Sequence, residues 1–300
     1  MTQRLARPLS AAELCDAMRR ERGFDPARLD RILGIDEARG LVEVQAGTTW
    51  RSLAARLRPA DAQVQASAAH TTVPTIGESI ARNAAGPDGR PAVSHVESLV
   101  IVTPDGELRR VSRQSHPELF ALAVGGQGLF GAVYSITLRI GSMMHAVRNG
   151  ASTPPSEPRS DALRLLVPPE ALERFLASAR ACCAGWRVAI ETLQVRSTLP
   201  EEETFLRWAR RDYREVVLQL AQPLTLGSSL KAIQLRRELI DAAIGLGGTF
   251  HISSTPEATR AQTEACYPQL KTFLAAKRRF DREERLVNPW YVRQRSLVCD

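Results

Sequence analysis

The sequence predicts an α+β protein of two domains, and two observations support this prediction. Helical patterns alternate along the 300 residues with short strand patterns that are bounded by turn-forming residues. Between Gly141 and Ser160 the composition shifts to Gly, Ser, Pro and Asn, which indicates a linker or a long loop. We therefore expect a first domain at residues 1–141, a second domain at residues 161–272 and a C-terminal tail at residues 273–300.

Helices and strands of the first domain follow from local patterns. Ser10 can cap a helix whose apolar stripe contains Leu14 and Met18. The turn Pro104-Asp105-Gly106 joins two strands, because proline fixes one dihedral and glycine supplies the unusual one. The expected helices are Ser10–Arg22, Thr48–Leu57 and Pro117–Val124, and the expected strands are Leu41–Gln45, Leu99–Thr103, Glu107–Val111 and Tyr134–Ile140.

The second domain has the same kind of alternation and predicts a small sheet with helices on one face. Expected helices lie at Pro169–Ala184, Glu202–Arg210 and Ser228–Ile244, and expected strands at Val188–Val195, Val216–Leu220 and Thr249–Ser253. A further helix is expected at Gln269–Phe280, followed by a stretch, Asp281 to Tyr291, with little regular pattern.

Composition excludes several classes of protein. The net charge is +7, but only three of the 40 basic residues are lysines, and the arginines are scattered among acidic residues. Because a nucleic-acid surface needs clustered positive charge, we expect no nucleic-acid partner. No apolar run reaches membrane-spanning length, and the first ten residues lack the apolar stretch of a signal peptide. The sequence therefore predicts a soluble, cytoplasmic protein without a membrane span.

The sequence contains none of the common catalytic or metal-binding motifs. Its five cysteines are an odd number without metal-ligand spacing, which favours reduced structural thiols. No carboxylate pair, metal-ligand cluster or nucleophile elbow is present. We therefore assign neither a catalytic residue nor a metal ligand from these patterns.

Three glycines match the dinucleotide-binding fingerprint by spacing alone. Gly126, Gly128 and Gly131 fit G-x-G-x-x-G, but that fingerprint works only where a strand precedes it and a helix follows. Here the predicted helix precedes and the predicted strand follows. We interpret the glycines as a tight helix-to-strand turn where two backbone segments come close.

A second block of small residues is a better candidate for a ligand site. Thr75-Ile76-Gly77, Ala81, Asn83 and Gly86 would let backbone N–H and C=O groups approach a ligand without intervening side chains. Taken alone, the same block could be a loop and helix cap in any protein that mixes helices and strands.

The order of blocks resembles the FAD-binding domain of the vanillyl-alcohol oxidase and p-cresol methylhydroxylase (PCMH-type) flavoproteins. T-T-V-P-T-I-G-E-S-I-A-R-N-A-A-G is followed by H-V-E-S-L-V-I-V-T-P-D-G-E-L and then by P-E-L-F-A-L-A-V-G-G-Q-G-L-F-G-A-V-Y-S-I-T-L-R-I. I-L-G-I-D and V-E-V-Q-A-G-T-T-W precede them, and N-P-W-Y in the tail resembles the segment that folds back on the FAD domain. The similarity covers about two-thirds of the chain.

The resemblance implies a FAD-dependent oxidoreductase that acts on a C–H bond of an alcohol-like or sugar-like small molecule. FAD would be bound without a covalent link, and the tail would dock on the FAD domain. The residues implied to line FAD are Thr75, Ile76, Gly77, Glu78, Ala81, Asn83 and Gly86, with Val133 touching the adenine side through its backbone.

The chain departs from the family pattern at positions that matter for chemistry. The Gly-rich turn whose N–H groups cover the diphosphate is missing between the first helix and Leu29. Glu78 and Ala85 stand where the family often has a glycine and a histidine. After Gly247-Gly248, His251 is the one side chain able to take a proton. An alternative therefore stays open: a non-catalytic relative with weak or lost FAD binding, serving as a binding or structural protein.

Overall fold

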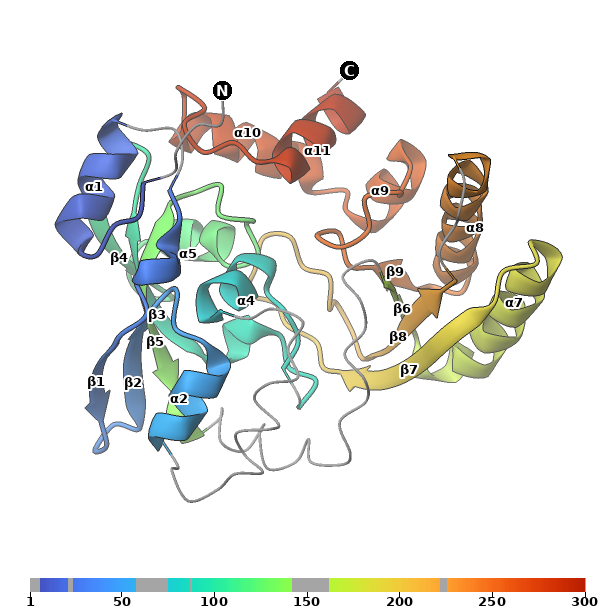
Figure 1. Cartoon of the computed structure of the whole chain (residues 1–300), viewed down its shortest axis with the longest axis horizontal. Helices are drawn as coiled ribbons and strands as arrows, with labels where there is room; N and C mark the ends of the chain where they lie inside the picture. Colours follow the sequence, from blue (N-terminus) through green and yellow to red (C-terminus); the bar gives the residue numbers. More distant parts are fainter. Residues whose placement is uncertain are drawn as a thin grey trace.

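The computed structural model describes residues 6–20, 24–57, 75–86, 88–141, 162–221 and 226–299. Two antiparallel sheets with helices packed against them make up this part of the chain (Figure 1). The predicted α+β class is confirmed. The predicted linker lies, after Gly141, outside the described residues, as do residues 71–74 of the FAD-like block.

The first sheet has five strands in the order β1-β2-β5-β3-β4. Alternate side chains of β2, β3 and β5 enter one core together with apolar residues of α2, α4 and α5, because successive side chains of a strand point to opposite faces. The elements are β1 (Ile32–Asp36), β2 (Leu41–Gln45), β3 (Val96–Val102), β4 (Leu108–Ser112), β5 (Ala132–Arg139), α2 (Trp50–Leu57), α4 (Ile76–Arg82) and α5 (Pro117–Ala123).

The first helix, α1 (Ala11–Arg20), packs on β3 and β5 through a smaller apolar cluster. Leu14 and Met18, the residues of the predicted stripe, are buried there beside Val102 and Ala132. Between α1 and β1 the described residues form only a short 3-10 helix, Pro26–Arg28, which Asp25 caps by accepting the Ala27 N–H.

The second sheet has four strands in the order β7-β8-β6-β9 and confirms the expected small antiparallel sheet. Its apolar face, which includes Leu165, Leu218 and Phe250, packs against α7 and α8, drawn together beyond the sheet in Figure 1. The elements are β6 (Leu163–Val167), β7 (Ile190–Thr198), β8 (Tyr213–Leu220), β9 (Thr249–Phe250), α7 (Leu172–Gly185) and α8 (Leu226–Gly245).

Three C-terminal helices complete the chain: α9 (Arg260–Cys266), α10 (Leu270–Phe280) and α11 (Pro289–Cys299). Phe130, which lies within the glycine turn, meets Phe273 and Phe280 of α10 edge to face, at centroid distances of 5.1 and 5.9 Å. Arg285 donates to the carbonyls of Met18 and Arg19 at the end of α1. The tail therefore contacts elements of the first sheet.

One predicted helix is wrong. Residues 202–210 form turns and irregular chain, because tertiary contacts hold their polar groups. Glu201 accepts the N–H groups of Glu203 and Thr204, and the Phe205 N–H donates to the Ala121 carbonyl of α5 at 2.9 Å. The stretch predicted to lack regular pattern is helical from Pro289 onward.

Candidate functional site

The first turn of α4 is fastened to the chain that follows β2. Thr75 caps the helix, since its Oγ1 accepts the Glu78 N–H at 3.2 Å. The Ile76 and Gly77 N–H groups donate to the Thr48 and Ala46 carbonyls at 2.9 and 2.8 Å. The three N–H groups that begin the helix therefore already have acceptors within the protein.

Gly77 is required by the packing of α4 itself. A Cβ at this position would lie 2.7 Å from the carbonyl oxygen of Ala46 and 2.9 Å from its Cβ. The missing side chain thus lets the helix approach the end of β2. The sequence shows that small size is needed at Gly77, and the structure shows that this space is filled by the protein's own backbone.

Asn83 ends α4 in the left-handed conformation, with φ +48°, and joins three parts of the chain. Its Oδ1 accepts the Val93 N–H at 2.9 Å, and its Nδ2 donates to Glu201 Oε1 at 3.3 Å. Its carbonyl accepts the Trp208 indole N–H at 3.0 Å. Asn83 is buried, and its amide therefore connects α4 to the segment that precedes β8.

The glycine-rich turn supports the other end of α4. The Gly125 N–H donates to the Ile80 carbonyl at 2.9 Å, and the Gln127 N–H donates to the Ala81 carbonyl at 2.9 Å. A Cβ on Gly126 would lie 1.9 Å from the Leu122 carbonyl oxygen. The turn joins α5 to β5, so the helix-to-strand interpretation is confirmed, and it satisfies carbonyls that the last turn of α4 leaves open.

Gly86 lies in a tight loop after α4. Its N–H donates to the Arg90 carbonyl at 2.8 Å, and a Cβ on it would lie 2.9 Å from Asp88 Oδ1. Asp88 in turn lies 3.5 Å from Nε2 of the buried His95. Burial alone would raise the pKa of the Asp88 carboxyl, but its interactions with His95 hold that pKa below the ordinary value.

The remaining candidates occupy two different places. Glu78 and Arg82, one helical turn apart on α4, are exposed, whereas Thr75 and Ala81 are half-buried. Val133 lies opposite Ile101 in the β3–β5 ladder and is half-buried beside the main core. The structure therefore gathers the α4 candidates on one short helix and places Val133 within the sheet.

Across from its helix-covered side, the second sheet has a face with charged residues. Strand register puts Glu215 of β8 opposite Arg196 of β7, and Arg164 of β6 next to the chain of His251. We call Arg164, Arg196, Glu215 and His251 the polar face. Arg164 Nη1 and Glu215 Oε1 are 3.0 Å apart, with side chains only 16% and 6% exposed.

His251 is the titratable group of the polar face whose state is best defined. Its Nδ1 lies 2.7 Å from the Ser253 hydroxyl, and its ring lies 5.0 Å from the Trp208 ring. Burial lowers its pKa to about 4, opposed by Glu215 and assisted by Arg164 and Arg82. The imidazole is therefore uncharged at neutral pH and is a weak proton acceptor.

Two observations place α4 beside the polar face. The positive charge of Arg82 helps to lower the pKa of His251, although Arg82 ends α4 beside the first sheet and His251 follows β9 of the second. Trp208 contacts the His251 ring and donates to the carbonyl of Asn83 at the end of α4. The exposed side of α4 and the charged side of the second sheet are thus neighbouring parts of one region.

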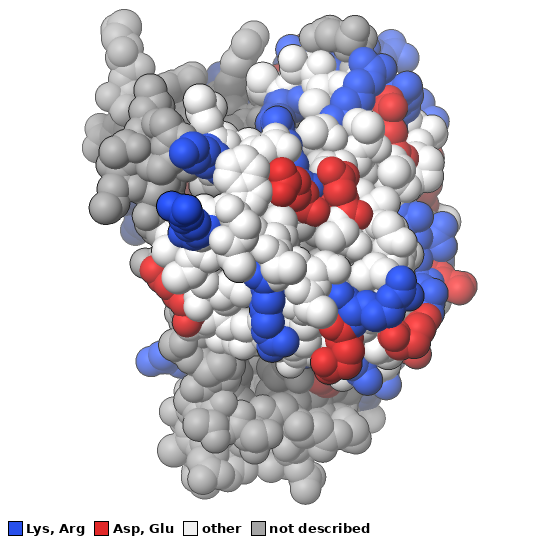
Figure 2. Space-filling model, turned by 90° about the vertical axis from the view of Figure 1, so that its right-hand side faces the viewer, with Lys and Arg blue, Asp and Glu red and all other residues white. Residues whose placement is uncertain are grey.

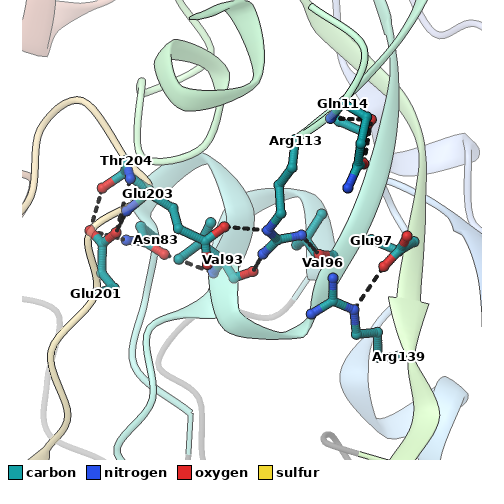
Figure 3. A network of polar contacts seen from close by, with 11 residues as sticks. Asn83, Val93, Val96, Glu97, Arg113, Gln114, Arg139, Glu201, Glu203 and Thr204 are labelled. Carbon is teal, nitrogen blue, oxygen red and sulfur yellow. Dashed lines mark hydrogen bonds and ion pairs between the residues drawn. The ribbon is translucent and has the colours of Figure 1, made fainter. Parts of the chain in front are cut away.

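A polar network fixes this arrangement (Figure 3). The Arg113 guanidinium donates to the carbonyls of Val93 and Val96 at 3.0 and 2.6 Å and pairs with Glu203. Glu201 accepts from Asn83 and from the Thr204 hydroxyl. Residues of the first sheet's side and residues 201–204 are therefore joined by charged hydrogen bonds, which are stronger than neutral ones.

Sequence reasoning singled out His251, but it did not identify Glu201, Arg113 or the three charged residues of the polar face. The signal that could have found the polar face is the placement of Arg164, Arg196 and Glu215 within otherwise apolar or alternating strands, where an inward charge needs a reason. The contacts of Arg113 and the bond from Asn83 to Glu201 have no comparable signal, since these partners are distant in sequence.

The described cysteines, Cys15, Cys182, Cys183 and Cys266, are unpaired thiols. Burial raises the pKa of Cys182 to about 11, with Glu238 acting in the same direction. Within the described ranges, no three His, Cys, Asp or Glu side chains gather in a way that could hold a metal ion. None of the helices in this part of the chain combines the length and the apolar character needed to cross a bilayer.

A family model described as "FAD binding domain" matches residues 23–112. Over these residues the chain is similar to a FAD-binding domain. The match runs from the chain just before β1 to the end of β4 and includes α4, with every α4 candidate residue and Gly86. The resemblance inferred from the sequence is confirmed over these residues, and FAD is the cofactor that the domain implies.

One similar protein is L-galactono-1,4-lactone dehydrogenase 1, mitochondrial, of Oryza sativa subsp. japonica. The two sequences are 34% identical over 115 residues, which is 38% of this chain and 20% of that protein. The aligned part thus spans about a fifth of the relative's length. That protein's name describes a dehydrogenase, and the likeness extends only to the aligned part.

The described residues fit FAD in part. The strands β1 to β4 lie within the matched residues, and on α4 the side chains of Glu78 and Arg82 are exposed beside the polar face. The beginning of α4 does not fit a diphosphate, because its first three N–H groups have acceptors within the chain and Glu78 adds a negative charge. Among the described residues, Arg82 is the exposed cation of α4 that could face an anionic cofactor.

Proposed function

We propose that the protein is a FAD-dependent oxidoreductase acting on a C–H bond of an alcohol-like or sugar-like small molecule. The observation that carries this proposal is the FAD-binding domain at residues 23–112. The likeness of 115 residues of the chain to a dehydrogenase supports it. When bound, the flavin would supply the redox chemistry by accepting a hydride from the substrate.

The chain's own residues would bind and orient the substrate. The polar face offers charged and neutral polar side chains next to α4, and partial burial there strengthens each electrostatic contact. His251, being neutral at ordinary pH, is suited to hydrogen bonding and not to carrying charge. The Arg113 and Glu201 network would hold the two sheets in a fixed relation around the substrate.

The alternative function is a non-catalytic family member that binds FAD weakly or not at all and serves as a binding or structural protein. One observation favours it: the N–H groups of Ile76, Gly77 and Glu78 are all used within the protein. Each missing hydrogen bond to a charged acceptor weakens binding by about 1 kcal/mol or more.

The test is whether the purified protein binds and uses flavin. We would record its visible absorption spectrum and then titrate FAD while following the melting temperature, which a ligand specific for the folded state must raise. Anaerobic addition of polyols, aldonolactones and sugar acids should then bleach the flavin absorption with at least one of them. A protein that shows no thermal shift at high FAD would contradict the oxidoreductase proposal and support the alternative.

We also propose a cytoplasmic protein with a small-molecule substrate and without a nucleic-acid partner. The unpaired cysteines fit a reducing compartment. On the described surface seen in Figure 2, basic and acidic residues are interspersed, and nucleic acid would need a continuous basic surface. A gel-shift titration with random DNA and RNA tests the second point, since binding at physiological salt would contradict it.

A further inference from the structure

The polar face carries more positive than negative charge. Arg164 forms an ion pair with Glu215, with 3.0 Å between Nη1 and Oε1. Among the described residues of the face, Glu215 is the carboxylate that lies beside both Arg164 and Arg196. Arg196 lies opposite Glu215 in the ladder, but its hydrogen bond is made to the neutral Gln194 amide oxygen, at 2.8 Å. Within the described residues, Arg196 has no carboxylate at ion-pair distance.

This surplus charge lies in a position that disfavours it. Arg196 is half-buried, and burial lowers the pKa of its guanidinium, with Arg164 acting in the same direction and Glu215 opposing both. Arg82 adds a third positive charge near His251. A guanidinium that is partly removed from water and faces another cation gains most from an anionic partner.

We propose that the polar face binds the carboxylate of a small polyhydroxy acid at Arg196. The planar fork of a guanidinium matches the two oxygens of a carboxylate. Since Glu215 already compensates Arg164, Arg196 is the one surplus charge among the four residues of the polar face itself, and its guanidinium fork matches one carboxylate. The neutral His251 ring, the uncharged member of the face, adds no competing charge.

That this acid is the substrate of the oxidoreductase rests on the proposed function, whereas binding of the acid does not. Binding of the anion itself depends on the second sheet, which lies outside the matched FAD-binding domain. The two proposals can therefore fail separately.

The experiment compares gluconate with sorbitol, which has a similar hydroxylated chain but no carboxylate. Both are titrated into the full chain without added FAD, by calorimetry and by thermal shift, with sodium chloride matching the ionic strength. Gluconate should bind and raise the melting temperature, whereas sorbitol should do neither. Arg196→Gln should weaken gluconate binding by about tenfold or more, since a charge-assisted hydrogen bond contributes ~1.5–3 kcal/mol.

Arg214→Gln is the matched control. Arg214 precedes Glu215 on β8 and is half-buried like Arg196, but successive side chains of a strand point to opposite faces, and its guanidinium donates to the Ser197 hydroxyl at 2.8 Å. Its replacement should leave gluconate affinity unchanged. Circular dichroism checks that both variants fold. Arg196→Lys, which keeps the charge and loses the fork, should retain part of the affinity, and it replaces Arg196→Gln if that variant does not fold.

Three outcomes would overturn the inference. These are equal binding of gluconate and sorbitol, equal loss of gluconate binding in Arg214→Gln and Arg196→Gln, and tighter binding of inorganic phosphate than of gluconate. FAD titration of the same samples separates the two proposals. Gluconate binding without FAD binding keeps the anion site and removes the oxidoreductase, and FAD binding without gluconate binding does the reverse.

Discussion

His251 shows how a single buried side chain links the polar face to the stability of the fold. Its pKa is about 4 in the folded protein because burial disfavours the charged imidazole. In the unfolded chain a histidine titrates near its model value of 6.5. Between these values the unfolded state binds more protons, so the free energy of unfolding falls as pH falls through this window.

We expect His251→Gln to remove part of this pH dependence. Wild type should lose stability between about pH 7 and pH 5, at up to roughly 1.4 kcal/mol per pH unit, and the variant should lose less. Urea unfolding at both pH values measures the difference. The exposed His116 is the control, since His116→Gln should keep the wild-type slope. Parallel pH profiles for wild type and His251→Gln would contradict the burial argument.

Gly77→Ala should destabilise the protein by about 1–3 kcal/mol, the range for forcing extra volume into a packed site. Its new Cβ would meet the Ala46 backbone, which cannot rotate away as a flexible side chain could. Chemical denaturation measures the loss. Gly34→Ala is the control, because nothing lies within 4 Å of a Cβ at that position. Equal stability of both variants would show that α4 does not need this close approach.

Glu78→Gln should strengthen FAD binding, because it removes a negative charge from the exposed side of α4 where the resemblance places the cofactor. The affinity is measured by quenching of flavin fluorescence. Glu173→Gln removes an acidic residue from the first turn of α7, which packs on the second sheet, and should not change the affinity. Unchanged affinity in Glu78→Gln would place the phosphates away from this side chain.

At the scale of elements, the segment between β7 and β8 holds α4 in place. Glu201 accepts from the Asn83 amide, from the backbone N–H groups of Glu203 and Thr204, and from the Thr204 hydroxyl. Its carboxylate is therefore the common acceptor of donors from two parts of the chain. The predicted helix at 202–210 does not continue from this segment, because the Phe205 N–H, which would donate to the Glu201 carbonyl in a first helical turn, donates to the Ala121 carbonyl instead.

Glu201→Ala should lower the free energy of unfolding by about 1–3 kcal/mol for each buried donor left without an acceptor. The adjacent, exposed Glu202 provides the control, and Glu202→Ala should stay within about 0.5 kcal/mol of wild type. Denaturant unfolding measures both. If the two alanine variants were equally stable, Glu201 would not be the residue that joins α4 to this segment.

At the scale of the whole molecule, the tail closes over elements from both sheets. Asn288 donates to the Gln127 carbonyl of the glycine turn, and Trp290 donates to the Ile252 carbonyl after β9. Lys277 and Asp281 form a fully buried ion pair at 2.5 Å, and Asp281 also accepts the Leu286 N–H. A tail with contacts on both sides opposes separation of the two sheets.

Lys277→Ala should therefore cost about 3–5 kcal/mol, because it leaves the Asp281 carboxylate buried without its cation. Lys271→Ala on the same helix removes only an exposed pair with Glu264 and should cost at most about 1 kcal/mol. Thermal and urea unfolding measure both losses. A small effect of Lys277→Ala would mean that the tail tolerates an unpaired buried charge.

Local patterns predicted the elements whose signals are contained within a few residues. The strand Leu41–Gln45 has the predicted bounds, because its period-two alternation reflects a sheet with one buried face. The helix α5 begins at the predicted proline. The helix α9 was not predicted, although Thr259 and Gln262 form a capping box there. The helix α11 was not predicted either, because its sequence has no strong amphipathic pattern and its contacts are made with segments distant in the chain.

The sequence by itself determined the fold class, the FAD-like order of blocks and the need for small residues at Gly77 and Gly126. These depend on backbone conformation and on spacing along the chain, which local residue types encode. Tertiary structure alone decided what those residues touch: Asn83 meets Glu201, 118 positions away, and the Gly77 N–H meets the Ala46 carbonyl instead of a ligand. It also decided that Arg164, Arg196 and Glu215 share one half-buried face, because strand register places distant residues side by side and no local pattern specifies that register.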